Sequence, residues 1–232
     1  MKKDLTELVF ILDRSGSMGG LESDTIGGFN SLLKKQKEVE GECLLTTVLF
    51  DNRYELLHDR IDIRGTAEIT REQYFTRGST ALLDAVGLTI KKISTAQKNT
   101  SDDFRPEKTL CVIITDGMEN SSREYRGHEI REMIERKKKE DGWEFVFLGA
   151  NIDAFETAEH MGISRDYSAN YHANSRGVSM NYCKMADGIS EMRKGNSQGI
   201  GMMCEYINEN YEKEKKNKKK NLPDDLSDKN KK

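Results

Sequence analysis

Long apolar runs are missing from this sequence: no stretch approaches the roughly 20 residues that a membrane-spanning helix requires. The amino terminus, Met1 to Asp4, leads directly into a strand-like run and contains no cleavage-type signal segment. A membrane-spanning protein and a secreted precursor are therefore not expected. We predict a cytoplasmic protein that has no membrane partner.

Cysteine is scarce, and no two of the four cysteines form a Cys-x-x-Cys pair. Cys43 and Cys111 lie inside apolar, strand-like runs, where a buried thiol acts as a small hydrophobic side chain. The four histidines do not stand at metal-ligand spacing from one another or from a cysteine. Neither a zinc site nor a disulfide framework is expected.

An excess of one charge sign is also absent, because 37 basic and 40 acidic residues are mixed along the chain and give a net charge of −3. The lysine run at residues 137–139 ends an expected helix, where cations complement the helix dipole and face solvent. Neither a P-loop nor a Gly-x-Gly-x-x-Gly turn follows any strand-like run. We therefore expect no specific nucleic-acid partner and no nucleotide cofactor.

Apolar residues make up 35% of the 232-residue chain, and they are gathered into runs that alternate between strand-like and helix-like spacing. The strand-like runs are residues 5–12, 43–50 with a return at 54–58, 109–115 and 143–149. The helix-like segments are residues 21–33, 82–93, 127–139 and 154–161. Alternating strands and helices predict an α/β fold with a doubly wound, mostly parallel central sheet, one antiparallel edge hairpin and helices on both faces.

The chain divides into one domain and two appendages in this interpretation. Residues 1–165 form the α/β domain, and residues 166–210 form a helical extension that packs on it, with a weakly amphipathic helix between Val178 and Met192. Residues 211–232 are rich in lysine and glutamate and contain little apolar surface to offset the entropy of ordering. We expect this last segment to be a disordered tail.

Small oxygen donors follow two of the expected strands and open one expected helix. Asp13, Ser15 and Ser17 alternate after the first strand, Thr80 opens a helix, and Asp116 follows a later strand. Ligands of an open parallel sheet bind at the carboxyl ends of its strands, so these five side chains can meet. Because all five offer hard oxygen atoms, the set favours Mg²⁺ or Mn²⁺ over zinc or copper.

The same residues resemble a known family. Three segments are similar to the three motifs of von Willebrand factor A-type domains, in the same order and strand context: Asp13-Arg14-Ser15-Gly16-Ser17-Met18, Gly78 to Ala85, and Ile114-Thr115-Asp116-Gly117. The resemblance covers about residues 5–165. It implies a metal-ion-dependent adhesion site in which Ser15, Ser17 and Thr80 ligate the ion while Asp13 and Asp116 act directly or through water.

Each motif taken alone has a simpler interpretation as a turn or a helix cap. Four further polar residues could line the rim of the site or merely be solvated: Glu119, Asn120, Asn151 and Asp153. Asp84 is expected to face solvent or to support its loop.

The leading functional hypothesis is a protein-binding module without enzymatic activity. An Asp or Glu of a partner completes the coordination of its metal ion. Intracellular bacterial or phage-type relatives, as the resemblance implies, act as adaptors, with partners such as a MoxR-type AAA ATPase or a component of a tellurium-type stress system. One alternative is a metal-dependent phosphatase or hydrolase of haloacid-dehalogenase type, although the required second carboxylate is replaced by Ser15. Another is a structural module with an unused metal site.

Overall fold

A single six-stranded sheet forms the centre of the molecule in the computed structural model, which describes residues 1–220. The strands lie in the order β3-β2-β1-β4-β5-β6 and are β1 Lys2–Asp13, β2 Glu42–Phe50, β3 Tyr54–Asp62, β4 Pro106–Thr115, β5 Glu144–Ala150 and β6 Ser168–Tyr171. All neighbours run parallel except β2 and β3, which form an antiparallel hairpin at one edge. The predicted fold class is confirmed.

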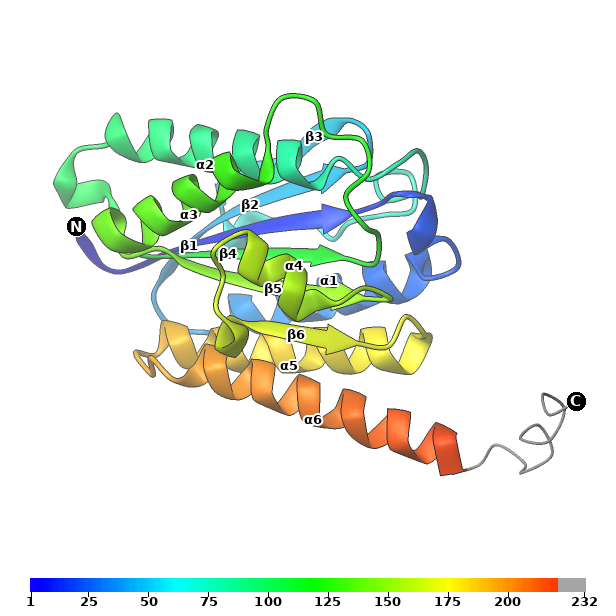
Figure 1. Ribbon diagram of the computed structural model, residues 1–232. Coiled ribbons are helices and arrows are strands. Elements are labelled where there is room, and N and C mark those ends of the chain that lie inside the picture. The colour runs from blue at the N-terminus through cyan, green and yellow to red at the C-terminus, as the bar shows by residue number, and fades with distance from the viewer. Residues whose placement is uncertain (221–232) are drawn as a thin grey trace, which may run out of the picture.

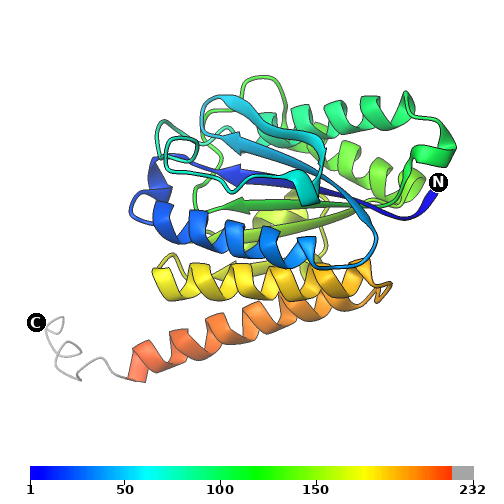
Figure 2. The same cartoon turned by 180° about the vertical axis from the view of Figure 1, so that it is seen from behind.

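Helices cover both faces of this sheet (Figures 1 and 2). They are α1 Glu22–Lys37, α2 Leu82–Lys98, α3 Gly127–Asp141, α4 Ala154–His160, α5 Ser175–Arg193 and α6 Gly199–Lys220. Alternation along β1 builds two cores, because Leu8, Phe10 and Leu12 contact the layer of α1, α5 and α6, whereas Val9 and Ile11 contact the layer of α2, α3 and α4. Every one of these five side chains is almost completely buried.

The sheet register brings the ends of β1 and β4 side by side. Strand β1 is paired on both sides, with Asp13 opposite Phe50 of β2 and Leu12 opposite Ile114 of β4. The loops that leave β1 and β4 therefore begin at the same edge of the sheet. This edge is where the polar motifs of the sequence meet.

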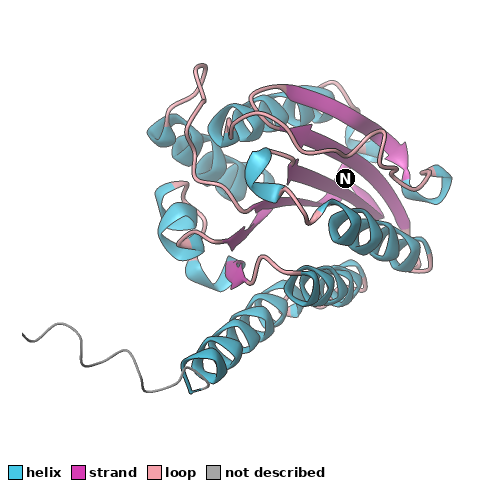
Figure 3. Cartoon of the chain, turned by 90° about the vertical axis from the view of Figure 1, so that its right-hand side faces the viewer, coloured by secondary structure: helices cyan, strands magenta, loops and turns pink. Residues whose placement is uncertain are grey.

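The C-terminal part differs from the sequence-based interpretation. Strand β6 was not predicted, and its pairing with β5 continues the sheet beyond the boundary drawn at residue 165. Helix α5 lies where a weakly amphipathic helix was expected, and α6 packs against both α5 and β6 (Figure 3). In residues 1–220, no helix combines the length and the apolar composition that crossing a membrane requires.

The predicted disorder from Tyr211 onward is not observed over residues 211–220, where α6 continues to Lys220. The ring of Tyr211 stacks on His172 at 4.4 Å between centroids, and Lys213 forms an (i, i+4) ion pair with Glu209 at 3.0 Å. Such contacts stabilise helix even where apolar residues are few. The rest of the predicted tail, residues 221–232, lies outside the described residues.

Candidate metal centre

The carboxylate of Asp13 is fixed at the end of β1 by neutral donors. The backbone N–H of Ser15 donates to its Oδ1 at 2.6 Å, and the hydroxyl of Thr115 donates to its Oδ2 at 2.5 Å. The hydroxyl of Tyr74 donates to the backbone carbonyl of the same residue at 2.6 Å. Asp13 is 1% exposed, so the chain holds this side chain in one orientation behind the surface.

Three hydroxyl groups converge next to Asp116. The Oγ atoms of Ser15 and Ser17 lie 3.0 Å apart, and Ser17 Oγ donates to Asp116 Oδ1 at 2.6 Å. A Cβ atom placed on Gly117 would lie 2.7 Å from Thr80 Oγ1, 3.0 Å from Ser17 Oγ and 3.5 Å from Ser15 Oγ. All three hydroxyl oxygens therefore surround one small space, which a side chain at position 117 would fill.

Thr80 reaches this space because two loops hold its backbone. Its N–H donates to Asn120 Oδ1 at 2.9 Å, and its carbonyl accepts from the N–H of Asn120 at 3.1 Å. The N–H of Gly16 donates to the carbonyl of Gly78 at 3.1 Å, and Gly78 has a φ of +66°, a conformation that favours glycine. The structure thus brings together the five predicted residues from three separate segments; their ligation of a metal stays a prediction.

The electrostatics of the two carboxyl groups fit an added cation. Burial raises the pKa of Asp13 to about 6, against the lowering effect of its bonds from Thr115 and Ser15, and Asp116 adds a smaller repulsion. Burial also raises the pKa of Asp116, whose Oδ2 is buried without a hydrogen-bond partner. Among residues 1–220, no positively charged side chain lines the cavity of about 370 Å³ beside these groups. The donors present are therefore suited to a divalent ion with oxygen ligands.

Alternative metal chemistry finds little support. Within residues 1–220, no group of three or more His, Cys, Asp or Glu side chains is arranged to hold a metal ion. All four cysteines are unpaired, and three of them are buried. A larger cavity of about 830 Å³ lies between α4 and α6, and none of the five predicted ligands lines it. The candidate centre thus depends on hydroxyl groups together with two carboxylates.

Two of the four residues considered for the rim, Glu119 and Asp153, serve the backbone instead. Both carboxylate oxygens of Glu119 accept backbone N–H groups, from Leu83 at 2.9 Å and from Ser121 and Ser122 at 2.9 and 2.7 Å. Asp153 caps the first turn of α4. Neither of the two expected alternatives, a rim position or simple solvation, describes these two residues, because unpaired N–H groups in the adjacent loops and helix ends bind their carboxylates.

Asn120 and Asn151 do line the cavity, and Asn120 also holds Thr80 as described above. Met118, which lines the cavity and is 74% exposed, and Ile152, which also lines it, were not singled out in the sequence analysis. The position of Met118 directly after Asp116-Gly117 was a usable signal.

Of the two expectations for Asp84, the one that it supports its loop is confirmed. This side chain supports a loop, since its carboxylate accepts the backbone N–H groups of Arg123, Glu124 and Tyr125 at 2.8 to 2.9 Å. The loop from residue 118 to 126 is thereby tied to the first turn of α2.

Comparison with known proteins places the fold. No protein-family model matches the sequence, and no curated protein matches it. Solved structures similar to 78% of this chain include a von Willebrand factor type A protein from Catenulispora acidiphila (TM-score 0.54, 12% identity), manganese-loaded TRAP from Plasmodium vivax (0.53, 17%), and mussel byssus proximal thread matrix protein 1 with a zinc-occupied MIDAS motif (0.53, 13%).

The matched region is only part of some of these proteins. It covers 41% of the Catenulispora chain, 44% of the mussel chain and 73% of the Plasmodium chain. At such low identity the likeness concerns the arrangement of strands and helices and not the function. The chain has the fold of the von Willebrand factor A-type domain.

Proposed function

We propose that this chain is a divalent-metal-dependent protein-binding module. Ser15, Ser17 and Thr80 would hold Mg²⁺ or Mn²⁺, and Asp13 and Asp116 would act directly or through water. Such an ion takes about six oxygen ligands, so positions remain for an Asp or Glu of a partner. The observation that carries the proposal is the buried Oδ2 of Asp116, which lacks a partner beside three converging hydroxyl groups.

The composition of the cavity supports binding over hydrolysis. Among the described lining residues, Asp116 is the only ionisable side chain, and no His or Lys is present to act as an acid or a base. Asp13 has Ser15 two residues later, where a phosphatase of haloacid-dehalogenase type requires a carboxylate. We therefore expect no Mg²⁺-dependent hydrolysis of p-nitrophenyl phosphate; activity that Asp13→Asn abolishes would support the enzymatic alternative.

The ion itself is proposed as Mg²⁺ on the chemistry of the ligands. Manganese and zinc in two of the similar structures support a divalent ion in general. A cytoplasmic adaptor role, with a partner such as an AAA ATPase or a stress-system component, completes the proposal. The mouth of the site offers apolar contact through Met118 and Ile152, so the partner's acidic residue would be flanked by an apolar one.

The experiment is affinity capture from a cell lysate in Mg²⁺ and, in parallel, in EDTA. The matched variant is Ser15→Ala with Ser17→Ala, which removes two hydroxyl ligands without touching the core. The proposal expects a partner that is captured only by the wild type in Mg²⁺ and that is lost when one of its own Asp or Glu residues is replaced. Capture that is equal in EDTA and with the double variant would indicate a structural module whose metal site is unused.

A further inference from the structure

Arg14 lies between two of the proposed ligands but belongs to none of the interactions described so far. Its side chain is completely buried, which is unusual for arginine next to a surface site. A buried guanidinium is costly unless charged and polar groups satisfy it. The surroundings of Arg14 therefore indicate what this residue does.

All three donor nitrogens of the Arg14 guanidinium have partners. Nε donates to Asp51 Oδ2 at 3.1 Å, Nη2 donates to Glu55 Oε2 at 2.6 Å, and Nη1 donates to the backbone carbonyl of Gln73 at 3.3 Å. These partners come from the turn after β2, from β3, and from the segment that leads to Thr80. One side chain thus links the first motif to the β2–β3 hairpin and to the segment that leads to Thr80.

A second arginine joins the same carboxylate. Arg77 Nε donates to Asp51 Oδ2 at 2.7 Å, and both guanidinium groups lie over the ring of Phe75, at 5.4 Å for Arg14 and 5.0 Å for Arg77. Asp51 is completely buried, and its backbone carbonyl accepts the N–H of Ala81 at 2.9 Å. Asp51 therefore binds both arginines through its side chain and holds Ala81, the residue after Thr80, through its backbone carbonyl.

Main-chain bonds run alongside these ion pairs. The N–H of Arg77 donates to the carbonyl of Arg14 at 2.9 Å, next to the bond from Gly16 to Gly78. The cluster of Arg14, Asp51 and Arg77 consequently lies where the segment that carries Ser15 contacts the segment that carries Thr80. A shift of either segment would break several of these contacts at once.

We propose that Arg14 is a positioning residue that sets the metal affinity of the site by holding the Ser15 and Ser17 loop at a fixed separation from Thr80. The inference rests on the proposed function, because it presupposes that these hydroxyl groups bind the ion. It adds that the affinity is determined by a buried ionic cluster that never touches the metal.

The test is titration of Mn²⁺ followed by its electron paramagnetic resonance signal, with the full chain well below its melting temperature. Arg14→Met should remain folded by circular dichroism and bind Mn²⁺ at least tenfold more weakly. Arg14→Lys keeps the charge but lacks the planar guanidinium that reaches all three partners, and it should recover only part of the affinity. Arg77→Met, at a partly exposed position, is a milder change that should weaken binding about threefold.

A matched control separates positioning from simple destabilisation. Ile134→Ala in α3 removes a fully buried side chain from the other core, away from the cluster, and should lower the melting temperature without changing Mn²⁺ affinity. Wild-type affinity in folded Arg14→Met would overturn the inference and leave the proposed function intact. If Arg14→Met does not fold, unchanged affinity in Arg77→Met would overturn it, and absence of Mn²⁺ binding by the wild type would overturn both.

Discussion

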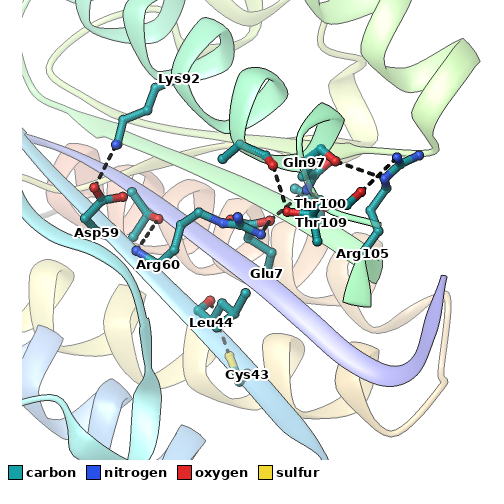
Figure 4. Close-up of polar contacts among 12 residues, drawn as sticks. Glu7, Cys43, Leu44, Asp59, Arg60, Lys92, Gln97, Thr100, Arg105 and Thr109 are labelled. Carbon is teal, nitrogen blue, oxygen red and sulfur yellow. Dashed lines mark hydrogen bonds and ion pairs between the residues drawn. The ribbon is translucent and has the colours of Figure 1, made fainter. Parts of the chain in front are cut away.

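Strand β1 carries one buried carboxylate in its middle and another at its carboxyl end, and the two have opposite kinds of hydrogen-bond partner. In the middle, Glu7 is completely buried and receives two bonds from Arg60, at 2.6 and 3.3 Å, and one from Gln97 Nε2 at 2.7 Å (Figure 4). At the carboxyl end, Asp13 receives bonds only from neutral donors, and Asp116 beside it keeps one oxygen without a partner.

The difference fits a structural role for Glu7 and the metal-binding role that we propose for the other two carboxylates. The chain supplies a cation for Glu7 through Arg60, whereas among the described residues no cationic side chain lines the cavity beside Asp116. Both sites lie on the same strand, six residues apart, so burial alone does not explain the contrast. Unsatisfied groups in a native fold are concentrated where function requires them.

The largest expected effect concerns Glu7, in the middle of β1. Arg60→Met leaves the carboxylate of Glu7 buried without its cation, and we expect the free energy of unfolding to fall by about 3–5 kcal/mol. Thermal unfolding should shift down by about 10 °C for a domain of this size. Mn²⁺ affinity should not change, because Glu7 lies six residues before Asp13 on β1 and neither it nor Arg60 lines the candidate site.

The control for this change is Arg64→Met. Arg64 forms an exposed ion pair with Asp62, so its replacement should leave the melting temperature essentially unchanged. Equal effects of the two substitutions would show that Glu7 does not depend on its internal cation.

At the carboxyl end of β1, we expect a substitution to raise the free energy of unfolding instead of lowering it. Asp13→Asn removes a carboxylate that burial disfavours, so the metal-free variant should be more stable than the metal-free wild type at pH 7.5, by up to about 3 kcal/mol. Asparagine can keep the contacts to Ser15 N and Thr115 Oγ1, because the threonine hydroxyl both donates and accepts.

The pH dependence follows from the raised pKa of Asp13. A carboxyl with a pKa of about 6 when folded and 3.8 when unfolded contributes stability that is present below pH 3.8 and lost as pH rises through 6. Denaturant unfolding in EDTA from pH 4 to 7.5 should show the stability gap between Asp13→Asn and wild type widening over that range. A constant gap would contradict a buried, uncompensated carboxylate.

The smallest effect is expected at the mouth of the site. Met118→Ser should weaken binding of a captured partner by a few-fold, because the exposed methionine offers apolar contact beside the ion. Mn²⁺ affinity should stay at the wild-type value in this variant. Met202→Ser, which changes a 60% exposed methionine on α6, serves as the control and should leave partner binding unaltered.

The meeting of the five residues at the candidate site was predictable, because each of them is marked by a local pattern in the sequence. Asp13, Ser15 and Ser17 alternate within five residues, and Thr80 and Asp116 stand at a helix start and a strand end that periodicity reveals. The ion pairs of Arg14 that hold these segments together were not predictable. The side-chain partners of Arg14 lie 37 and 41 residues away in the sequence, at separations where no local pattern applies.

Strand β6 was missed for a similar reason. Its four residues, Ser168 to Tyr171, show no strong alternation of polar and apolar side chains, yet all of them are buried. Asn208 of α6 donates to the carbonyl of Ser168 at 3.0 Å and accepts the N–H of Asn170 at 2.9 Å, which satisfies this edge strand. A helix about 40 residues later thus stabilises the strand. The sequence next to the strand contains no pattern that predicts this contact.

The most direct test of the contrast along β1 is calorimetric titration of Mg²⁺ into the purified wild type, into Asp13→Ala and into Arg60→Met. We predict that wild type and Arg60→Met bind one ion with the same affinity and that Asp13→Ala binds none. Absence of binding by the wild type at millimolar Mg²⁺, or equal binding by Asp13→Ala, would contradict the assignment of the carboxyl end as a metal site.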